Sequence, residues 1–349
     1  MAELRRNPIN GQWVIVHVED SWGPEQYERE NHVIRFKATC QFCPGKEFLT
    51  PPEIEAVRRS PPGSAANSPG WQVRIIPNKF PALRIEGNLD LRHDGMYTLS
   101  NGIGAHEVFI ETPAHERNLA DLNDEEMFHV IDKYQSRLND LTKDRRFKYV
   151  LIFKNYGESA GTTVEHPHSQ IIALPMVPQY VAQELEGTRA YYDRYQRCVC
   201  CDMIAQEYRD GARVITDNAR FLAFCPFASG YPFECCIIPR EHSCRFDTMN
   251  DGEKHALGNI LRETMARIKG CLGDPSYNFY IHVAPVNDGP PMASLANGGP
   301  HEHFHWHIEI VPKLMRTVGL ERGTGFFSVP TDPGHAARYL REAAVAARR

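Results

Sequence analysis

The sequence lacks several features that would assign it at once to a broad class. It contains no run of about 18 apolar residues, and its first residues, MAELRRNPING, include no apolar segment of the signal-peptide kind. The formal net charge is −5 and no stripe of basic residues occurs, so nucleic acid is not expected as a partner. We therefore expect a cytoplasmic protein that binds neither membranes nor nucleic acid.

The remaining composition is that of an ordinary globular protein. The chain has 349 residues, which is enough for two domains or for one large bilobal domain. Ten cysteines in a cytoplasmic protein indicate free thiols or metal ligands rather than disulfides.

Two Cys-x-x-Cys pairs stand out among the cysteines. CQFC supplies Cys40 and Cys43, and CVCC supplies Cys198 and Cys201. A spacing of two residues lets the backbone turn so that both sulfurs reach one ion. Neither pair introduces an evident βαβ unit with a helix starting at its first cysteine, so a redox pair is the weaker interpretation.

An internal repeat indicates where further ligands lie. The segment that begins at His106, HEVFIETPAHERNLADLNDEE, matches FECCIIPREHSCRFDTMNDGE at a constant offset. Further along, HPHSQII matches HWHIEIV after an insertion at residues 286–300, whose Gly and Pro content predicts a loop. The matched pairs are Glu107–Glu234, His115–His242, Asn123–Asn250, Tyr149–Tyr277, His166–His305, His168–His307 and Gln170–Glu309.

Each half then has the same order: a Cys-x-x-Cys pair, a strand leading to a histidine, a helix, a strand and a His-x-His strand. Asn/Asp starts, acidic first turns and apolar residues at helical spacing predict helices within residues 122–141 and 249–273. The alternative is that two unrelated α+β segments resemble one another by chance.

The repeat assigns one Cys₂His₂ set to each half. Such a set suits tetrahedral zinc with no open position, which makes both sites structural. A second set, Glu184, His282, His305 and His307, competes in the second half as a site for iron or zinc. The ligands that we favour are Cys40, Cys43, His115 and His166 in the first half, and Cys198, Cys201, His242 and His305 in the second.

The segment VEHPHSQII places three nitrogen-bearing side chains on alternate positions of a predicted strand, so that they share one face. If His166 binds zinc, His168 is free to attack phosphorus and form a covalent phosphoramidate. Gln170 on the same face can donate its amide to the non-bridging oxygens.

The loop before this strand offers hydroxyls and backbone N–H groups that suit phosphate; its polar and Gly residues include Asn155, Gly157, Ser159, Gly161, Thr162 and Thr163. The second half has Glu309 in place of Gln170, and a carboxylate there would repel phosphate. We therefore interpret the second half as a structural partner of the first.

These motifs together resemble a known family. In order along residues 7 to about 327 they are NPINGQWVIV, CQFC, VRIIPNKFPAL, HEVFIETPAH, FKNYGESAG, HPHSQ, YPFECCIIPREH and VGLERGTGFF. Their identity and order are similar to those of galactose-1-phosphate uridylyltransferases, the transferase branch of the histidine-triad superfamily.

The resemblance implies an α+β fold of two histidine-triad-like halves in tandem, residues 1–185 and 186–349, around an extended, mostly antiparallel sheet. It also implies a homodimer. From the two Cys₂His₂ sets we expect two zinc ions per chain, with iron as the alternative at the second site. The expected reaction is ping-pong transfer of a nucleoside monophosphate from a nucleotide sugar to a hexose 1-phosphate, of the UDP-glucose:galactose-1-phosphate type.

The resemblance also implies roles for individual residues. His168 is the expected nucleophile and Gln170 its partner, while Thr163, with Thr162 beside it, takes the place of a phosphate-binding serine. The nucleotide pocket is expected to include Asn78, Asn155 and Gly161. Glu321 lies where the family contacts the hexose from the other subunit.

Two departures from the family leave the substrates open. VEDSWGPEQY, at residues 18–27, is acidic where the uridylyltransferases carry an Arg-rich segment, and the second Cys-x-x-Cys pair and ERGTGFF are more similar to the related plant ADP-glucose phosphorylase. The alternatives to uridylyl transfer are an ADP-sugar phosphorylase, with phosphate as the acceptor, and a non-enzymatic zinc scaffold.

Overall fold

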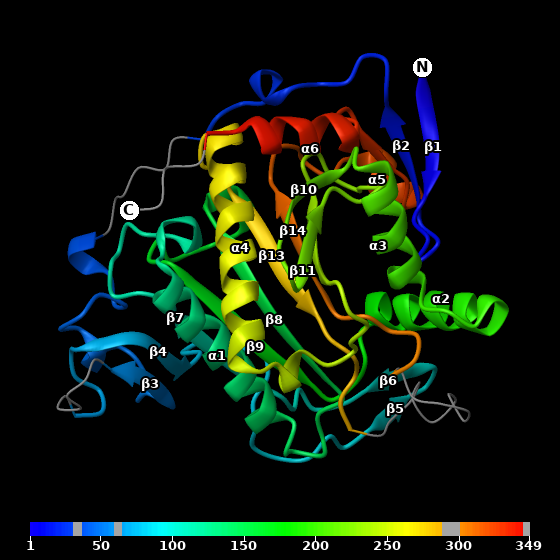
Figure 1. Ribbon diagram of the computed structural model, residues 1–349. Helices are drawn as coiled ribbons and strands as arrows, with labels where there is room; N and C mark the ends of the chain where they lie inside the picture. Colours follow the sequence, from blue (N-terminus) through cyan, green and yellow to red (C-terminus); the bar gives the residue numbers. More distant parts are fainter. Residues whose placement is uncertain (31–36, 59–64, 288–300, 345–349) are drawn as a thin grey trace.

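The fold is α+β and is built on one large sheet (Figure 1). The structure, a computed structural model, describes residues 1–30, 37–58, 65–287 and 301–344. Most of the insertion predicted to be a loop, residues 288–300, therefore lies outside the described residues. No helix within the described ranges has both the length and the apolar character needed to cross a membrane.

The helices are α1 (Asp124–Leu141), α2 (Gln179–Tyr195), α3 (Val199–Asp210), α4 (Asp251–Leu272), α5 (Gly319–Thr324) and α6 (Pro333–Glu342). The strands are β1 (Ala2–Arg6), β2 (Trp13–His17), β3 (Glu55–Arg58), β4 (Trp71–Pro77), β5 (Arg92–Asp94), β6 (Tyr97–Leu99), β7 (Ala105–Ile110), β8 (Tyr149–Tyr156), β9 (His168–Leu174), β10 (Val214–Asp217), β11 (Phe221–Phe224), β12 (Cys235–Pro239), β13 (Tyr277–His282), β14 (His307–Pro312) and β15 (Phe327–Val329).

The strand order reflects the internal repeat. Within the described chain, ten strands pair in the order β10-β11-β12-β14-β13-β8-β9-β7-β4-β3, and every pairing is antiparallel. The order from β8 outward through β9 and β7 mirrors the order from β13 outward through β14 and β12. The two halves therefore meet at the β8–β13 pair in the middle of one continuous sheet.

The division at residues 185 and 186 falls inside α2, where the helix continues without a linker. Strands from both halves share the sheet, and buried side chains from both halves form one apolar cluster. The two segments thus share one core, and the division at 185 stays a prediction.

One face of the sheet is covered by α1 and α4, the two helices predicted within residues 122–141 and 249–273 (Figure 1). Each of these helices starts at an asparagine, Asn123 or Asn250, whose side chain accepts the N–H of a glutamate three residues later. Gly258 allows the helices to approach closely, since a Cβ there would lie 3.1 Å from the Cβ of Met127.

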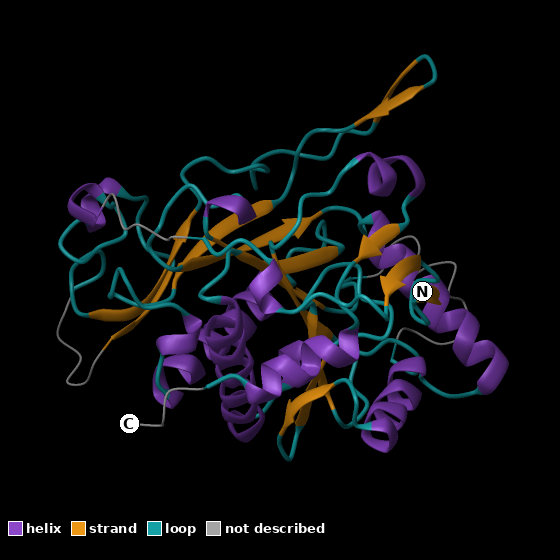
Figure 2. Ribbon diagram, turned by 90° about the horizontal axis from the view of Figure 1, so that it is seen from above, coloured by secondary structure: helices purple, strands orange, loops and turns teal. Residues whose placement is uncertain are grey.

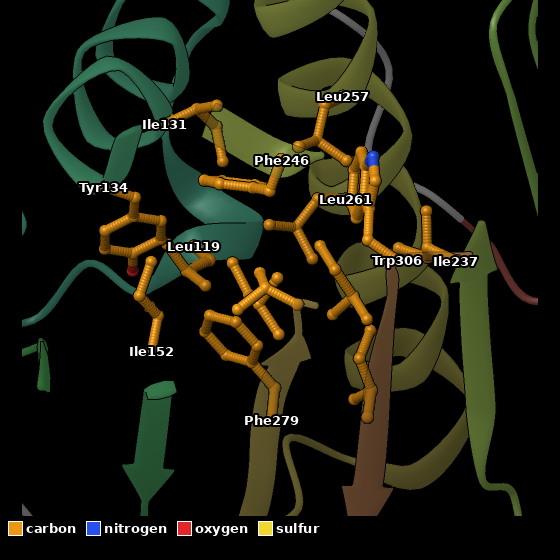
Figure 3. Packing of buried hydrophobic residues seen from close by; sticks show 14 of the residues in the cluster. Leu119, Ile131, Tyr134, Ile152, Ile237, Phe246, Leu257, Leu261, Phe279 and Trp306 are labelled. Atoms are coloured by element: carbon orange, nitrogen blue, oxygen red, sulfur yellow. The ribbon is translucent and has the colours of Figure 1, made fainter. Parts of the chain in front are cut away.

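The core lies between these helices and the sheet. Figure 3 shows Ile131 and Tyr134 of α1 and Leu257 and Leu261 of α4 packed toward the sheet residue Phe279. Because side chains alternate along a strand, the residues next to these core positions point to the opposite face of the sheet. That face carries His168, Gln170 and Asn155, so the core packing determines which polar groups the sheet displays.

The structure corrects the alignment of the two halves by one residue in β7 and β12. Val108 lies opposite Gln170 in the β7–β9 pair, and Cys236 lies opposite Glu309 in the β12–β14 pair. His106, rather than Glu107, therefore corresponds to Glu234.

Two local expectations also need correction. Helix α3 does begin at the second Cys-x-x-Cys pair, with Cys198 as its N-cap, although it follows helix α2 rather than a strand. His166 and His305 lie just before β9 and β14 rather than inside them. In the first case Pro167 has no N–H to donate to the sheet, so the regular strand starts at His168.

A buried ion pair lies beneath β9 on the helix-covered face. The ammonium of Lys154 is 2.6 Å from the Glu111 carboxylate and donates to the His168 carbonyl at 3.0 Å. The hydroxyl of Tyr134 lies 3.0 Å from the other Glu111 oxygen and 2.7 Å from the hydroxyl of Ser169. Burial lowers the pKa of Lys154, although the neighbouring Glu111 favours its charged form.

We expect Lys154→Met to lower the free energy of unfolding by about 3–5 kcal/mol, because it leaves the Glu111 carboxylate buried without a counter-charge. Denaturant unfolding measures this loss. Lys154→Met/Glu111→Gln should recover most of it, and Lys143→Met, in an exposed ion pair with Asp140, should cost less than about 1 kcal/mol. Equal losses of unfolding free energy for Lys154→Met and Lys143→Met would contradict this expectation.

Candidate active site

The four residues predicted to bind the first metal lie together. Their ligand atoms are all within 4.8 Å of one another. The Sγ of Cys43 is 3.3 Å from Nδ1 of His115 and 3.6 Å from Nδ1 of His166. The other ring nitrogen of His166 donates to the Thr112 carbonyl at 2.8 Å, so Nδ1 faces the sulfur with its lone pair.

The second predicted set has the same arrangement. Cys198, Cys201, His242 and His305 also place their ligand atoms within 4.8 Å of one another. Nδ1 of His242 is 3.6 Å from the Sγ of Cys201, and its Nε2 donates to the His301 carbonyl at 2.8 Å. Nδ1 of His305 lies 3.9 and 3.8 Å from the sulfurs of Cys198 and Cys201.

Both clusters fit zinc. In a tetrahedral zinc site the usual bond lengths place sulfur and nitrogen ligands about 3.6 Å apart, close to the separations found here. In each cluster a histidine Nδ1 lone pair faces cysteine sulfur, an arrangement of electron-pair donors that suits a cation between them. The hydrogen bonds from Nε2 of His166 and of His242 to backbone carbonyls also fix the tautomer that binds a metal through Nδ1.

The structure replaces one member of the competing metal-ligand set in the second half. Glu184, His282, His307 and Glu309 form a third group within 4.8 Å, in which Glu309 takes the position that we had assigned to His305. His305 belongs to the cysteine cluster, so the two sets are neighbours and do not compete. His282 lies 3.1 Å from Glu184 and 3.5 Å from Glu309, and its ring stacks on that of His307 at 4.6 Å.

His168 begins β9 and is held in one orientation. Its Nδ1 donates to the carbonyl of His166 at 2.9 Å, and its ring packs edge-on against Phe42. Its Nε2 has no hydrogen-bond partner within the described residues. Burial lowers the pKa of His168 to about 4, with the positive charge of Lys154 adding to the effect, so the neutral form with a free Nε2 lone pair dominates at neutral pH.

Gln170 lies on the same face as His168 and contacts two further side chains. Its Oε1 is 2.8 Å from Nε2 of His106 and 3.3 Å from Nδ2 of Asn78. The sequence predicted a site role for Asn78, but His106 was used only as the start of the repeat. Only the corrected register places His106 of β7 on the same face of the sheet as Gln170 of β9.

The loop between β8 and β9 forms a turn beside this surface. Gly157 and Gly161 adopt φ angles of 81° and 88°, which favour glycine, so the loop requires both residues. Asn278, on β13 of the second half, donates to Asn155 at 2.8 Å and to the Ala160 carbonyl at 3.1 Å. The second half therefore orients part of the predicted site, a role that sequence reasoning missed.

The remaining predicted residues, Thr162, Thr163 and Glu321, make other contacts. The hydroxyl of Thr162 donates to the Val164 carbonyl at 3.1 Å, and Thr163 lines a hollow of about 330 Å³ together with Lys79 and His115. The Glu321 carboxylate accepts the N–H of Val318 at the start of α5. No hydrogen bond joins Glu321 to the His168 surface within the part of the chain that the structure describes.

The corresponding histidine of the second half has different surroundings. Nδ1 of His307 faces the His305 carbonyl at 3.1 Å, as in the first half. Its Nε2, however, lies 3.8 Å from the Glu309 carboxylate. Although burial alone would raise it, the nearby His282 holds the pKa of Glu309 below its usual range, so this group is an anion where phosphate would have to bind.

Known proteins resemble this chain over most of its length. The profile described as galactose-1-phosphate uridyl transferase, N-terminal domain, matches residues 1–178. ADP-glucose phosphorylase from Arabidopsis thaliana is 31% identical over 344 residues, which cover 97% of this chain and 92% of that protein. The chain belongs to the galactose-1-phosphate uridylyltransferase family.

Other members extend the comparison over the whole chain. Galactose-1-phosphate uridylyltransferase from Thermotoga maritima is 26% identical, with 99% of both chains covered. The crystal structure of an ADP-glucose phosphorylase from Arabidopsis thaliana with bound ADP-glucose superposes with a TM-score of 0.79 at 31% identity, over 99% of this chain and all of that one. The protein is therefore an enzyme of a nucleotidyltransferase family, and the non-enzymatic scaffold is set aside.

We expect Cys40→Ser to remove about one zinc ion per chain and to destabilise the protein, because structural zinc can contribute on the order of 10 kcal/mol to folding. Elemental analysis and thermal melting measure the two effects. Cys271→Ser, a change at a cysteine outside all three groups, should leave the zinc content unchanged. Purified wild-type protein that is folded and free of zinc would contradict the assignment.

Proposed function

We propose that the enzyme transfers a nucleoside monophosphate from a nucleotide sugar through a covalent intermediate on His168. The observation that carries this proposal is the hydrogen bond from Nδ1 of His168 to the His166 carbonyl. It leaves the lone pair on Nε2, next to Gln170 and beside a glycine-containing loop. An imidazole held in this tautomer is a competent nucleophile without prior loss of a proton.

The proposed reaction has two displacements. Nε2 of His168 attacks the α-phosphorus, the bond from that phosphorus to the bridging oxygen breaks, and hexose 1-phosphate leaves with the electron pair. An acceptor phosphate oxygen then attacks the same phosphorus and breaks the phosphorus–nitrogen bond. The neutral imidazole is restored, and the nucleoside monophosphate is now joined to the acceptor.

We infer that the donor is an ADP-sugar and that the acceptor is inorganic phosphate, so that the products are hexose 1-phosphate and a nucleoside diphosphate. This choice is supported by the relative named ADP-glucose phosphorylase, at 31% identity, and by the bound ADP-glucose in its structure. Uridylyl transfer to galactose 1-phosphate is the second candidate, because the matched family profile and the Thermotoga maritima relative carry that name.

The other predicted residues have proposed supporting roles. We propose that Asn78, Asn155 and Gly161 line the nucleotide pocket and that Thr162 and Thr163 bind phosphate. Glu321 would reach the hexose from the partner in a homodimer, since within one chain it makes no contact with the His168 surface in the described residues. Two zinc ions, held by the Cys₂His₂ clusters, would supply rigidity around His166 and His305 rather than chemistry.

Incubation with ADP-glucose without an acceptor should add one adenylyl group per chain and release glucose 1-phosphate. Intact-mass measurement and peptide mapping should place the adduct on His168. His168→Gly should abolish the adduct and lower turnover by several orders of magnitude while ADP-glucose still binds, because only the nucleophile is lost.

His307→Asn provides the matched control, because His307 has the same position in the second half and an anionic neighbour. It should retain adduct formation on His168. Addition of phosphate or of galactose 1-phosphate to the isolated adduct then separates the two candidates by which acceptor removes the nucleotide. An adduct on His307, or none with either ADP-glucose or UDP-glucose, would overturn the proposed function.

A further inference from the structure

We propose that His106 is a positioning residue that fixes the amide of Gln170, so that both N–H groups of Gln170 face the phosphate being transferred. The inference rests on the proposed function of His168 and Gln170. By this proposal, His106 contacts neither the nucleophile nor the substrate. The inference is based on a chain of hydrogen bonds that begins at two backbone N–H groups.

The first backbone donor determines the tautomer of His106. The N–H of Ala82 points to Nδ1 of His106 at 3.1 Å. A backbone N–H can only donate, so Nδ1 must be the accepting nitrogen. Burial lowers the pKa of His106, in keeping with a neutral ring whose single proton is on Nε2. Nε2 is therefore a donor.

The second backbone donor determines the orientation of Asn78. The N–H of Phe80 donates to Oδ1 of Asn78 at 2.9 Å. The other terminal atom of Asn78 is therefore the Nδ2 amide, which can only donate. The contact of 3.2 Å between this nitrogen and Nε2 of His106 joins two donors, so it is not a hydrogen bond but a consequence of their shared acceptor.

That acceptor is Gln170. Nε2 of His106 lies 2.8 Å and Nδ2 of Asn78 lies 3.3 Å from the same terminal atom of Gln170. Two donors stabilise an oxygen at this position and exclude an NH₂ group. The Nε2 amide of Gln170 must then point away from both, and it has no acceptor within the described residues.

The consequence is chemical. A half-turn about the last torsion of a glutamine exchanges the positions of its amide oxygen and nitrogen, and a free side chain samples both orientations. With the oxygen turned outward, Gln170 would place a negative dipole against phosphate oxygens. With the oxygen held by His106, it offers two donors where negative charge builds in the transfer step. The shorter of the two contacts assigns most of this control to His106.

The second half lacks this arrangement. Its residue at the position of His106 is Glu234, and its residue at the position of Gln170 is Glu309. The Glu234 carboxyl instead accepts the N–H groups of Gly230 and Tyr231, at 2.8 and 3.0 Å, and no hydrogen bond joins it to Glu309 within the described residues. The hydrogen bonds that fix the Gln170 amide therefore have no counterpart in the described residues of the second half.

The test is a double-mutant cycle between His106 and Gln170, read out by the single-turnover rate of adduct formation from ADP-glucose. His106→Leu removes the donor and should lower this rate about tenfold or more, with melting temperature and zinc content retained. His106→Gln restores an N–H at the position of Nε2 and should bring the rate to within about threefold of wild type. In the Gln170→Ala background, His106→Leu should have no further effect.

A second measurement keeps the inference separate from the proposed function. AMP carries the phosphate without a leaving group, so we expect it to bind without reaction. Calorimetry should show weaker AMP binding for His106→Leu than for wild type, but no difference in the Gln170→Ala background. If wild type forms no adduct, the proposed function fails and this binding cycle decides the inference. Equal rates for wild type and His106→Leu, additive losses in the double variant, or AMP affinities that do not depend on His106 would each overturn the inference.

His93→Leu, at an exposed histidine of the β5–β6 hairpin, serves as the control and should match wild type.

Discussion

The carbonyl of His166 connects the first metal cluster to the candidate nucleophile. His166 directs its Nδ1 to the cysteines, while its backbone oxygen accepts Nδ1–H of His168. Any movement of His166 would change the tautomer and the direction of His168. By our proposal, a closed metal site that takes no part in chemistry would therefore still determine whether His168 is ready to react.

The sheet supplies the second constraint. Figure 2 shows long helices packed along one side of the large sheet. That covered face bears the shared core and the Lys154–Glu111 pair, and the other face bears the candidate polar site. Lys154 contacts the His168 carbonyl from the covered face, whereas Phe42 contacts its ring. The backbone and the imidazole of one residue are thus fixed from different directions, which reduces the entropy lost when substrate binds.

The two halves show how one framework can give two corresponding histidines, His168 and His307, different surroundings. Both histidines donate Nδ1–H to the carbonyl two residues earlier. The difference lies in the neighbours, where Gln170 and His106 are replaced by Glu309 and Glu234. These changes of charge leave the strand pairing intact, because the side chains project from the face that the core does not use.

Much of this protein was predictable from sequence alone. Local rules were sufficient for α1 and α4, since their caps and apolar spacing lie within single segments, and spacing with the repeat was sufficient to group both Cys₂His₂ sets. Tertiary structure decided what depends on contacts between distant strands: that Glu309 rather than His305 joins Glu184, His282 and His307, and that His106 rather than Glu107 shares the face of Gln170. A shift of one residue in strand register turns every side chain to the other face, and a repeat interrupted by loops does not specify that register. The tautomers of His166, His168 and His106 likewise depend on carbonyl and N–H groups that only the folded backbone brings within hydrogen-bonding distance.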